Sequence, residues 1–136
     1  MFKKIKIVLT DVDGVLTDGG MYYSVDGDVM KKFHARDGMG ISLLRKNDIP
    51  TIIITKEKTK MVKHWSKKMS VKLFDGVLNK EDILEKICTE YHVSPSEIAY
   101  IGDDVNDVNL LKLVGLSVVP KDGNPIAKKS SNYISK

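Results

Sequence analysis

The sequence predicts a doubly wound α/β fold on a parallel sheet, with a β-hairpin flap after the first strand and no cap domain. Two observations carry this prediction. Short apolar segments alternate with helical patterns along the chain, which is the order of a parallel strand–helix–strand sheet. Those apolar segments, such as TIIIT at 51–55, lack polar–apolar alternation, as expected of strands buried on both faces.

The first third of the chain carries a strand, a hairpin and a helix. IKIVLT at 5–10 is rich in β-branched and other apolar residues, which favours a buried strand. MYYSVDGDVMKKF at 21–33 holds an Asp-Gly turn signal between two short strands. A helix is expected over residues 37–47. The side chains expected to face inward from this helix are Ile41, Leu43 and Leu44.

The remainder of the chain repeats the alternation of strand and helix. A lysine-rich helix is expected from Glu57 to Met69. Ser94 and Glu97 form a capping-box pattern with proline at the first helical position, which predicts a short helical turn. The other expected elements are strands at 71–74, 98–101, 116–119 and 133–134, and helices at 80–91, 106–114 and 125–129.

Length, composition and charge favour one globular domain, residues 1–136, that acts on a small molecule. Charged residues are 29% and hydrophobic residues 42%, the balance of an ordinary globular chain. A single cysteine, Cys88, makes no internal disulfide and agrees with a cytoplasmic location. The net charge of +4 comes from lysines with few aromatics between them, so we expect no nucleic-acid partner, and no apolar run predicts a membrane partner.

Polar side chains follow four of the predicted strands at their carboxyl ends. Because the carboxyl ends of parallel strands meet at one edge of a sheet, where ligands bind, we expect these side chains to lie close together. They are Asp11 and Asp13 after the first strand, Thr55 after the second, Lys80 beyond the third, and Asp103, Asp104 and Asp107 after the fourth.

Their chemistry predicts transfer of a phosphoryl group. Clustered carboxylates repel one another, and Mg²⁺ relieves the repulsion while keeping room for a substrate phosphate. Asp11 is placed to attack phosphorus and form an aspartyl-phosphate, and Asp13 serves as the acid for the leaving group and the base for water. Gly14 allows a tight bend that exposes backbone N–H groups to the phosphate. Lys80 neutralises charge on the transferring group.

These residues carry a resemblance to a known superfamily. DVDGVLTDG, Thr55, Lys80 and GDDVND resemble the four motifs of the haloacid dehalogenase-like phosphatases, which have a Rossmann-like fold. Within that superfamily the chain is most similar to the cap-less phosphatases of 3-deoxy-D-manno-octulosonate 8-phosphate and of nonulosonate 9-phosphates. The segments that carry this closer likeness are LTDG at 16–19, Lys32-Phe33, Arg36-Asp37-Gly38, and AYIGDDVNDVNLL at 99–111.

The resemblance implies a role for each matching residue and a place in lipopolysaccharide or sialic-acid-type biosynthesis. It implies an aspartyl nucleophile, an acid/base two residues later, a phosphate-binding threonine and lysine, and a Mg²⁺ site. The residues concerned are Asp11 as nucleophile, Asp13 as acid/base, Thr55 and Lys80 at the phosphate, Asp11, Asp103 and the backbone carbonyl of Asp13 at the metal, and Asp104 and Asp107 in support.

The second motif departs from the usual pattern. Lys56 stands where a small residue usually lets the substrate approach. Glu57 is more similar to the nonulosonate enzymes, with Lys68 as its possible partner, and it is equally explained as an acid at a helix start. Both the eight-carbon and the nine-carbon sugar acid therefore stay open as substrates.

The absence of a lid predicts an oligomer. Only 41 residues separate Asp13 from Thr55, and the hairpin and first helix use them, so no segment is left to cover the site. The hairpin at 21–33 is too apolar for a free flap. The resemblance implies a homotetramer in which this hairpin covers the site of a neighbouring subunit.

Three other functions remain as alternatives. The same chemistry can act on a different small phosphomonoester. A phosphoacceptor signalling module shares the strand-end aspartate and lysine, but Asp13 stands in the position that hydrolyses an aspartyl-phosphate. A non-catalytic interaction module would keep the fold without a use for clustered carboxylates, which cost stability.

Overall fold

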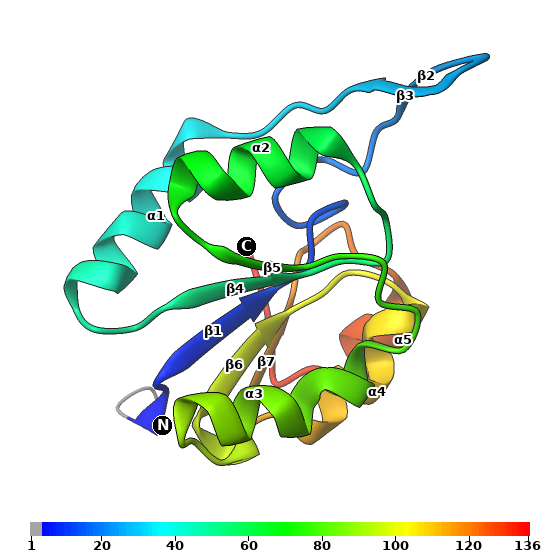
Figure 1. Cartoon of the computed structure of the whole chain (residues 1–136). Coiled ribbons are helices and arrows are strands. Elements are labelled where there is room, and N and C mark those ends of the chain that lie inside the picture. The colour runs from blue at the N-terminus through cyan, green and yellow to red at the C-terminus, as the bar shows by residue number, and fades with distance from the viewer. Residues whose placement is uncertain (1–3) are drawn as a thin grey trace.

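The structure, a computed structural model, describes residues 4–136 and is built on a six-stranded sheet (Figure 1). All paired neighbours are parallel, in the order β5-β4-β1-β6-β7-β8. Strand β1 lies inside the sheet, with β4 on one side and β6 on the other, which is the reversal point where such sheets bind ligands. The strands are β1 (Ile7–Thr10), β4 (Thr51–Ile54), β5 (Lys72–Phe74), β6 (Ile98–Ile101), β7 (Leu116–Val119) and β8 (Tyr133–Ile134).

Helices cover both faces of the sheet, as the sequence predicts (Figure 1). Helices α1 (Ala35–Lys46) and α2 (Lys60–Met69) lie on one face. Helices α3 (Leu84–Tyr91), α4 (Val108–Leu113) and α5 (Pro125–Lys129) lie on the other. Short 3₁₀ helices at Lys80–Ile83 and Val105–Asp107 lead into α3 and α4, and a third at Pro95–Glu97 has the expected capping box.

The isoleucine run of β4 explains why its residues do not alternate in polarity. Ile52 and Ile54 pack into a core cluster with residues of α3 and α4, while Ile53 packs with Val62 of α2 on the opposite face. All three isoleucines are fully buried. A strand covered on both faces needs apolar residues at every position, which confirms the expectation of a doubly wound sheet.

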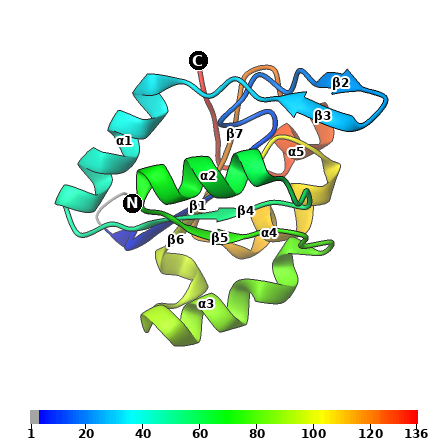
Figure 2. The same ribbon diagram turned by 45° about the horizontal axis from the view of Figure 1, so that its top comes forward.

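The predicted hairpin forms a separate two-stranded sheet that projects from the body (Figure 2). Strands β2 (Tyr22–Ser24) and β3 (Gly27–Met30) are antiparallel. Most of the apolar side chains of the hairpin are exposed in the single chain. The exposed ones are Met21, Tyr22, Tyr23, Val25, Val29 and Met30.

Two sequence predictions about the helices are wrong in detail. Helix α2 begins at Lys60 rather than Glu57, because the Thr59 hydroxyl caps it by accepting from the Val62 amide at 3.2 Å. Leu43 is 53% exposed, whereas Ile41 is buried, since two residues along an α-helix turn the side chain by about 200°. Among the described residues, no helix is both long and apolar enough to cross a membrane.

Candidate active site

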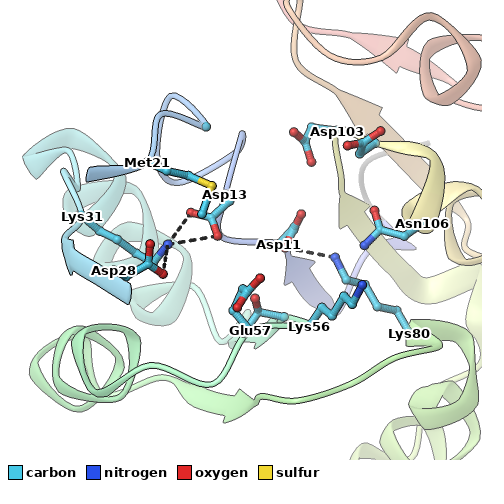
Figure 3. A pocket seen from close by; sticks show the side chains of 13 residues that line it. Asp11, Asp13, Met21, Asp28, Lys31, Lys56, Glu57, Lys80, Asp103 and Asn106 are labelled. Carbon is cyan, nitrogen blue, oxygen red and sulfur yellow. Dashed lines mark hydrogen bonds and ion pairs between the residues drawn. The ribbon is translucent and has the colours of Figure 1, made fainter. Parts of the chain in front are cut away.

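The carboxyl ends of β1, β4 and β6 meet at a cavity of about 280 Å³ (Figure 3). The topology brings together residues that are far apart in the sequence, because these three strands are neighbours and run in one direction. The hairpin and the loop beyond β5 complete the wall. The predicted site residues that line the cavity are Asp11, Asp13, Thr55, Lys56, Glu57, Lys80, Asp103 and Asp104.

Lys80 is the centre of a buried charge cluster. Its side chain is 1% exposed, and its ammonium lies 3.0 Å from Oδ1 of Asp11 and 2.6 Å from Oδ1 of Asp107. Burial acts to lower the pKa of Lys80, but the two carboxylates outweigh burial and the net pKa is raised. Lys80 is therefore a fixed cation beside Asp11.

Asp107 is fully buried and both of its carboxylate oxygens are in use. Oδ1 accepts from Lys80 and from the Tyr100 hydroxyl, while Oδ2 accepts from the amides of Asp103 at 2.9 Å and Asp104 at 3.1 Å. Burial would raise the pKa of Asp107, but the Lys80 charge and these hydrogen bonds lower it. This arrangement orients Lys80 and the loop after β6, and it leaves no oxygen of Asp107 free for a ligand.

Asp11 and Asp103 form a site that fits a divalent cation. Asp11, Asp103 and Asp107 offer oxygens within 4.8 Å of one another, and only those of Asp107 are fully engaged. Burial and the Asp11 carboxylate raise the pKa of Asp103 to about 8, and burial also raises the pKa of Asp11. Lys80 offsets the charge of Asp11 but not that of Asp103, so the two carboxylates need a second positive charge to be ionised together, and a hard cation with oxygen ligands supplies it.

Gly14 is required by the close approach of Asp103. Its φ is +83°, and a Cβ at this position would lie 1.7 Å from Oδ2 of Asp103. The tight bend predicted at Gly14 is therefore confirmed. Its amide, however, donates to the Thr17 hydroxyl at 3.3 Å, so the contact of this N–H group with phosphate stays a prediction.

Asp13 lies across the cavity from Lys80 and is held by a different lysine (Figure 3). Lys31 donates to both carboxylate oxygens of Asp13, at 2.9 and 3.1 Å, and the Thr17 hydroxyl lies 3.3 Å from Oδ1. Thus the two neighbouring aspartates have separate cationic partners, one from the body of the fold and one from the hairpin.

The outer part of the cavity differs from expectation at one residue. Lys56 and Glu57 are exposed, and they line the cavity from the loop between β4 and α2. Glu57 precedes the helix by three residues, so it is not a helix-start acid. Lys68, its expected partner, instead lines a separate hollow with Phe33, His34 and Trp65. The structure thus places Lys56 and Glu57, two of the predicted substrate-binding residues, at the cavity, but it does not place Lys68 there.

Sequence reasoning missed part of the lining. Asp28, Lys31 and Met21 come from the hairpin, and Asn106 lies between Asp104 and Asp107 in the fourth motif. The sequence could have predicted Asn106 as a site residue, since it stands beside Asp107 in the motif that follows the fourth strand. The hairpin residues have none, because a sequence pattern does not show which way a flap folds over a sheet.

The doubly wound sheet, with carboxylates and a buried lysine at its switch point, is typical of enzymes that use a divalent cation in phosphoryl transfer. Comparison with known proteins agrees: residues 45–136 match the family model described as haloacid dehalogenase-like hydrolase. The chain is 35% identical over 139 residues to the 3-deoxy-D-manno-octulosonate 8-phosphate phosphatase of Escherichia coli K12, covering 98% of this chain and 72% of that one. This chain belongs to the haloacid dehalogenase-like hydrolases, and its relatives in that family are phosphatases.

Solved structures show the same fold across the chain. The cobalt-bound deoxy-D-mannose-octulosonate 8-phosphate phosphatase of Haemophilus influenzae has a TM-score of 0.94 at 32% identity, covering 98% of this chain and 78% of that one. The octulosonate 8-phosphate phosphatase of Moraxella catarrhalis, in complex with a magnesium ion, a phosphate ion and KDO, has a TM-score of 0.94 at 30% identity, with coverage of 99% and 78%.

Proposed function

We propose that this protein hydrolyses a phosphorylated 2-keto-3-deoxy sugar acid, with 3-deoxy-D-manno-octulosonate 8-phosphate as the leading substrate. The protein is a magnesium-dependent phosphatase of the family identified above. The observation that carries the proposal is the buried Lys80 cation 3.0 Å from Asp11, with Asp13 two residues further on at the same cavity. The similarity to 3-deoxy-D-manno-octulosonate 8-phosphate phosphatases supports a sugar-acid phosphate as the substrate.

In the first step, Asp11 attacks the phosphorus atom. An oxygen–phosphorus bond forms to the Asp11 carboxylate as the bond from phosphorus to the sugar oxygen breaks. The leaving oxygen takes a proton from Asp13 and departs as an alcohol. Lys80 and Thr55, both buried at the floor of the cavity, stabilise the negative charge on the phosphoryl oxygens.

In the second step, water attacks the aspartyl-phosphate. The Asp13 carboxylate accepts a proton from this water, the bond between phosphorus and Asp11 breaks, and inorganic phosphate leaves. The carboxylates of Asp11 and Asp103 and the backbone carbonyl of Asp13 would hold Mg²⁺, which supplies positive charge to the phosphate when bound. Asp107 keeps Lys80 in position throughout, and Asp104 supports the same loop.

The first test is magnesium-dependent phosphate release from a panel of substrates. The panel contains octulosonate 8-phosphate, nonulosonate 9-phosphates and hexose phosphates. We expect rapid release from a sugar-acid phosphate, its loss in EDTA, and a fall of about 10³-fold or more in Asp11→Asn. Asp48→Asn, the same change at an exposed residue between α1 and β4 and outside the cavity, is the matched control and should keep full activity. Release from none of the panel in the presence of magnesium would contradict the proposal.

A nonulosonate 9-phosphate is the second candidate, because Glu57 lines the cavity mouth. A carboxylate there can accept hydrogen bonds from the hydroxyls of a longer sugar, while Lys56 can pair with its acid group. We expect Glu57→Gln to raise KM by about tenfold only if the nine-carbon compound is the substrate. An unchanged KM for the nine-carbon compound would show that Glu57 does not contact it, which removes the observation that favours this second candidate.

The proposal includes a homotetramer in the cytoplasm. The projecting hairpin exposes a row of apolar side chains beside the cavity, and no cap domain lies between Asp13 and Thr55 to enclose a substrate. A second copy of this chain is the partner that would both bury the hairpin and close the cavity. The single cysteine, Cys88, supports a reducing compartment.

A further inference from the structure

We propose that Lys31 is a positioning residue, which holds the carboxyl group of Asp13 for proton transfer and thereby couples the hairpin to the reaction. The inference rests on the proposed function, in which Asp13 is the acid and the base. Lys31 donates to both oxygens of Asp13, at 2.9 and 3.1 Å. The hydroxyl of Thr17, at 3.3 Å, is a weaker partner and comes from the same turn as Asp13.

The surroundings of Lys31 favour positioning over substrate binding. Its side chain is 3% exposed, and Oδ2 of Asp28 lies 3.8 Å from its ammonium. One buried cation is therefore shared by two carboxylates, and its donors are directed at them (Figure 3). Lys56, by contrast, is exposed at the cavity mouth, where a lysine that pairs with a substrate carboxylate is expected.

The origin of Lys31 links two parts of the molecule. Asp13 lies in the turn after β1, whereas Lys31 directly follows β3, the second strand of the hairpin. Asp28, the second partner of Lys31, is itself in β3. An ion pair between Asp13 and Lys31 therefore fixes the acid/base residue relative to the hairpin. A change in the orientation of the hairpin would move Lys31 and, with it, the carboxyl group of Asp13.

The chemical step explains why a cation is useful at this place. As the bond from phosphorus to the leaving oxygen breaks, the Asp13 proton passes to that oxygen and Asp13 becomes a carboxylate. A cation 2.9 Å away stabilises the charge that develops in this step more than it stabilises the neutral acid. An alkoxide leaving group needs this proton, whereas p-nitrophenolate is a weak base that departs without it.

The test compares kcat/KM for octulosonate 8-phosphate and for p-nitrophenyl phosphate in Lys31→Met. For each substrate, kcat/KM reflects only the steps up to departure of the leaving group. The fraction of active enzyme is the same for both substrates, so it cancels when their kcat/KM values are compared. We expect kcat/KM for the sugar phosphate to fall by about 10- to 100-fold and that for the aryl phosphate to fall by less than about threefold. Lys31→Arg should recover much of the loss, since it restores the cation and its donors.

The control variant is Lys32→Met, which removes an adjacent lysine that is exposed and lies outside the cavity. It should leave both values unchanged. An equal fall for the two substrates in Lys31→Met, or no fall, would overturn the role of Lys31 and leave the proposed function intact. If Lys31→Met does not fold, Lys31→Gln is measured in the same way. A wild-type enzyme that hydrolyses neither substrate would instead refute the proposed function itself.

Discussion

At the scale of single residues, two aspartates four positions apart have opposite electrostatic situations. Asp107 has Lys80 at 2.6 Å, and its pKa is lowered despite complete burial. Asp103 has carboxylates for neighbours, and burial with the Asp11 charge raises its pKa to about 8. Asp107 is thus satisfied by the protein alone, whereas Asp103 is suited to a charge that arrives from outside.

This difference predicts how pH affects the stability of the magnesium-free protein. Between about pH 4 and pH 8 the unfolded state has lost the Asp103 proton while the folded state retains it, so stability falls as pH rises through that window. Asp103→Asn removes this loss. In EDTA, we expect its melting temperature to exceed that of the wild type by a few degrees at pH 8, and the difference to shrink at pH 5. Thermal denaturation at the two pH values, with and without magnesium, measures it.

Two outcomes would contradict this prediction. A difference in melting temperature that is the same at both pH values would mean that Asp103 is not the titrating group. Stabilisation of Asp103→Asn by magnesium to the same extent as the wild type would mean that Asp103 does not bind the ion. The matched variant Asp48→Asn, an exposed acid between α1 and β4, should show neither effect.

Residue-level prediction from the sequence succeeds where a residue ends a strand. Asp11, Thr55 and Asp103 lie at one cavity because parallel topology fixes where strand ends go. Lys31 could not be found in this way, since its position depends on the direction in which the hairpin leaves the sheet. Lys68 is a different case: it lies in the last turn of α2, whereas the loop before this helix lines the cavity, and it lines a separate hollow with Phe33 and Trp65.

At the scale of elements, the turn after β1 depends on Gly14. The apolar strand and the Asp-x-Asp pattern predict where this turn begins, but the contact that requires glycine is with Asp103, a residue distant in sequence. Gly14→Ala would place a Cβ 1.7 Å from the Asp103 carboxylate on a backbone with φ of +83°. We expect it to destabilise the fold by about 1–3 kcal/mol and to weaken magnesium binding.

The comparison for this prediction is a second glycine-to-alanine change. Gly40 lies within α1, and a Cβ there meets no neighbour within 4 Å. Gly40→Ala should therefore stabilise the protein by about 0.5–1 kcal/mol, because alanine favours a helix. Chemical denaturation of both variants gives the two signs, and a Gly14→Ala protein as stable as the wild type would show that the Asp103 loop adapts freely.

At the scale of the whole molecule, the projecting hairpin predicts self-association. Val25 and Val29 are 103% and 57% exposed, and together with their neighbours they form an apolar surface on a two-stranded flap, which is unstable alone in water. We expect light scattering to give a mass of about 61 kDa for the wild type, four times the 15.2 kDa chain. Val25→Asp with Val29→Asp should give single chains, because charges cannot be buried between hairpins.

The same double variant also tests whether neighbouring subunits close the cavity. Enclosure concerns the sugar more than the phosphate, because the proposed reaction places the phosphate against Asp11 and Lys80, which already line the cavity within one chain. We therefore expect KM for the sugar-acid phosphate to rise by about tenfold or more, with little change for p-nitrophenyl phosphate. Leu113→Asp, a charge at an apolar residue that is 51% exposed on α4, should alter neither mass nor KM. A monomeric double variant with wild-type KM would show that the hairpin associates without serving the active site.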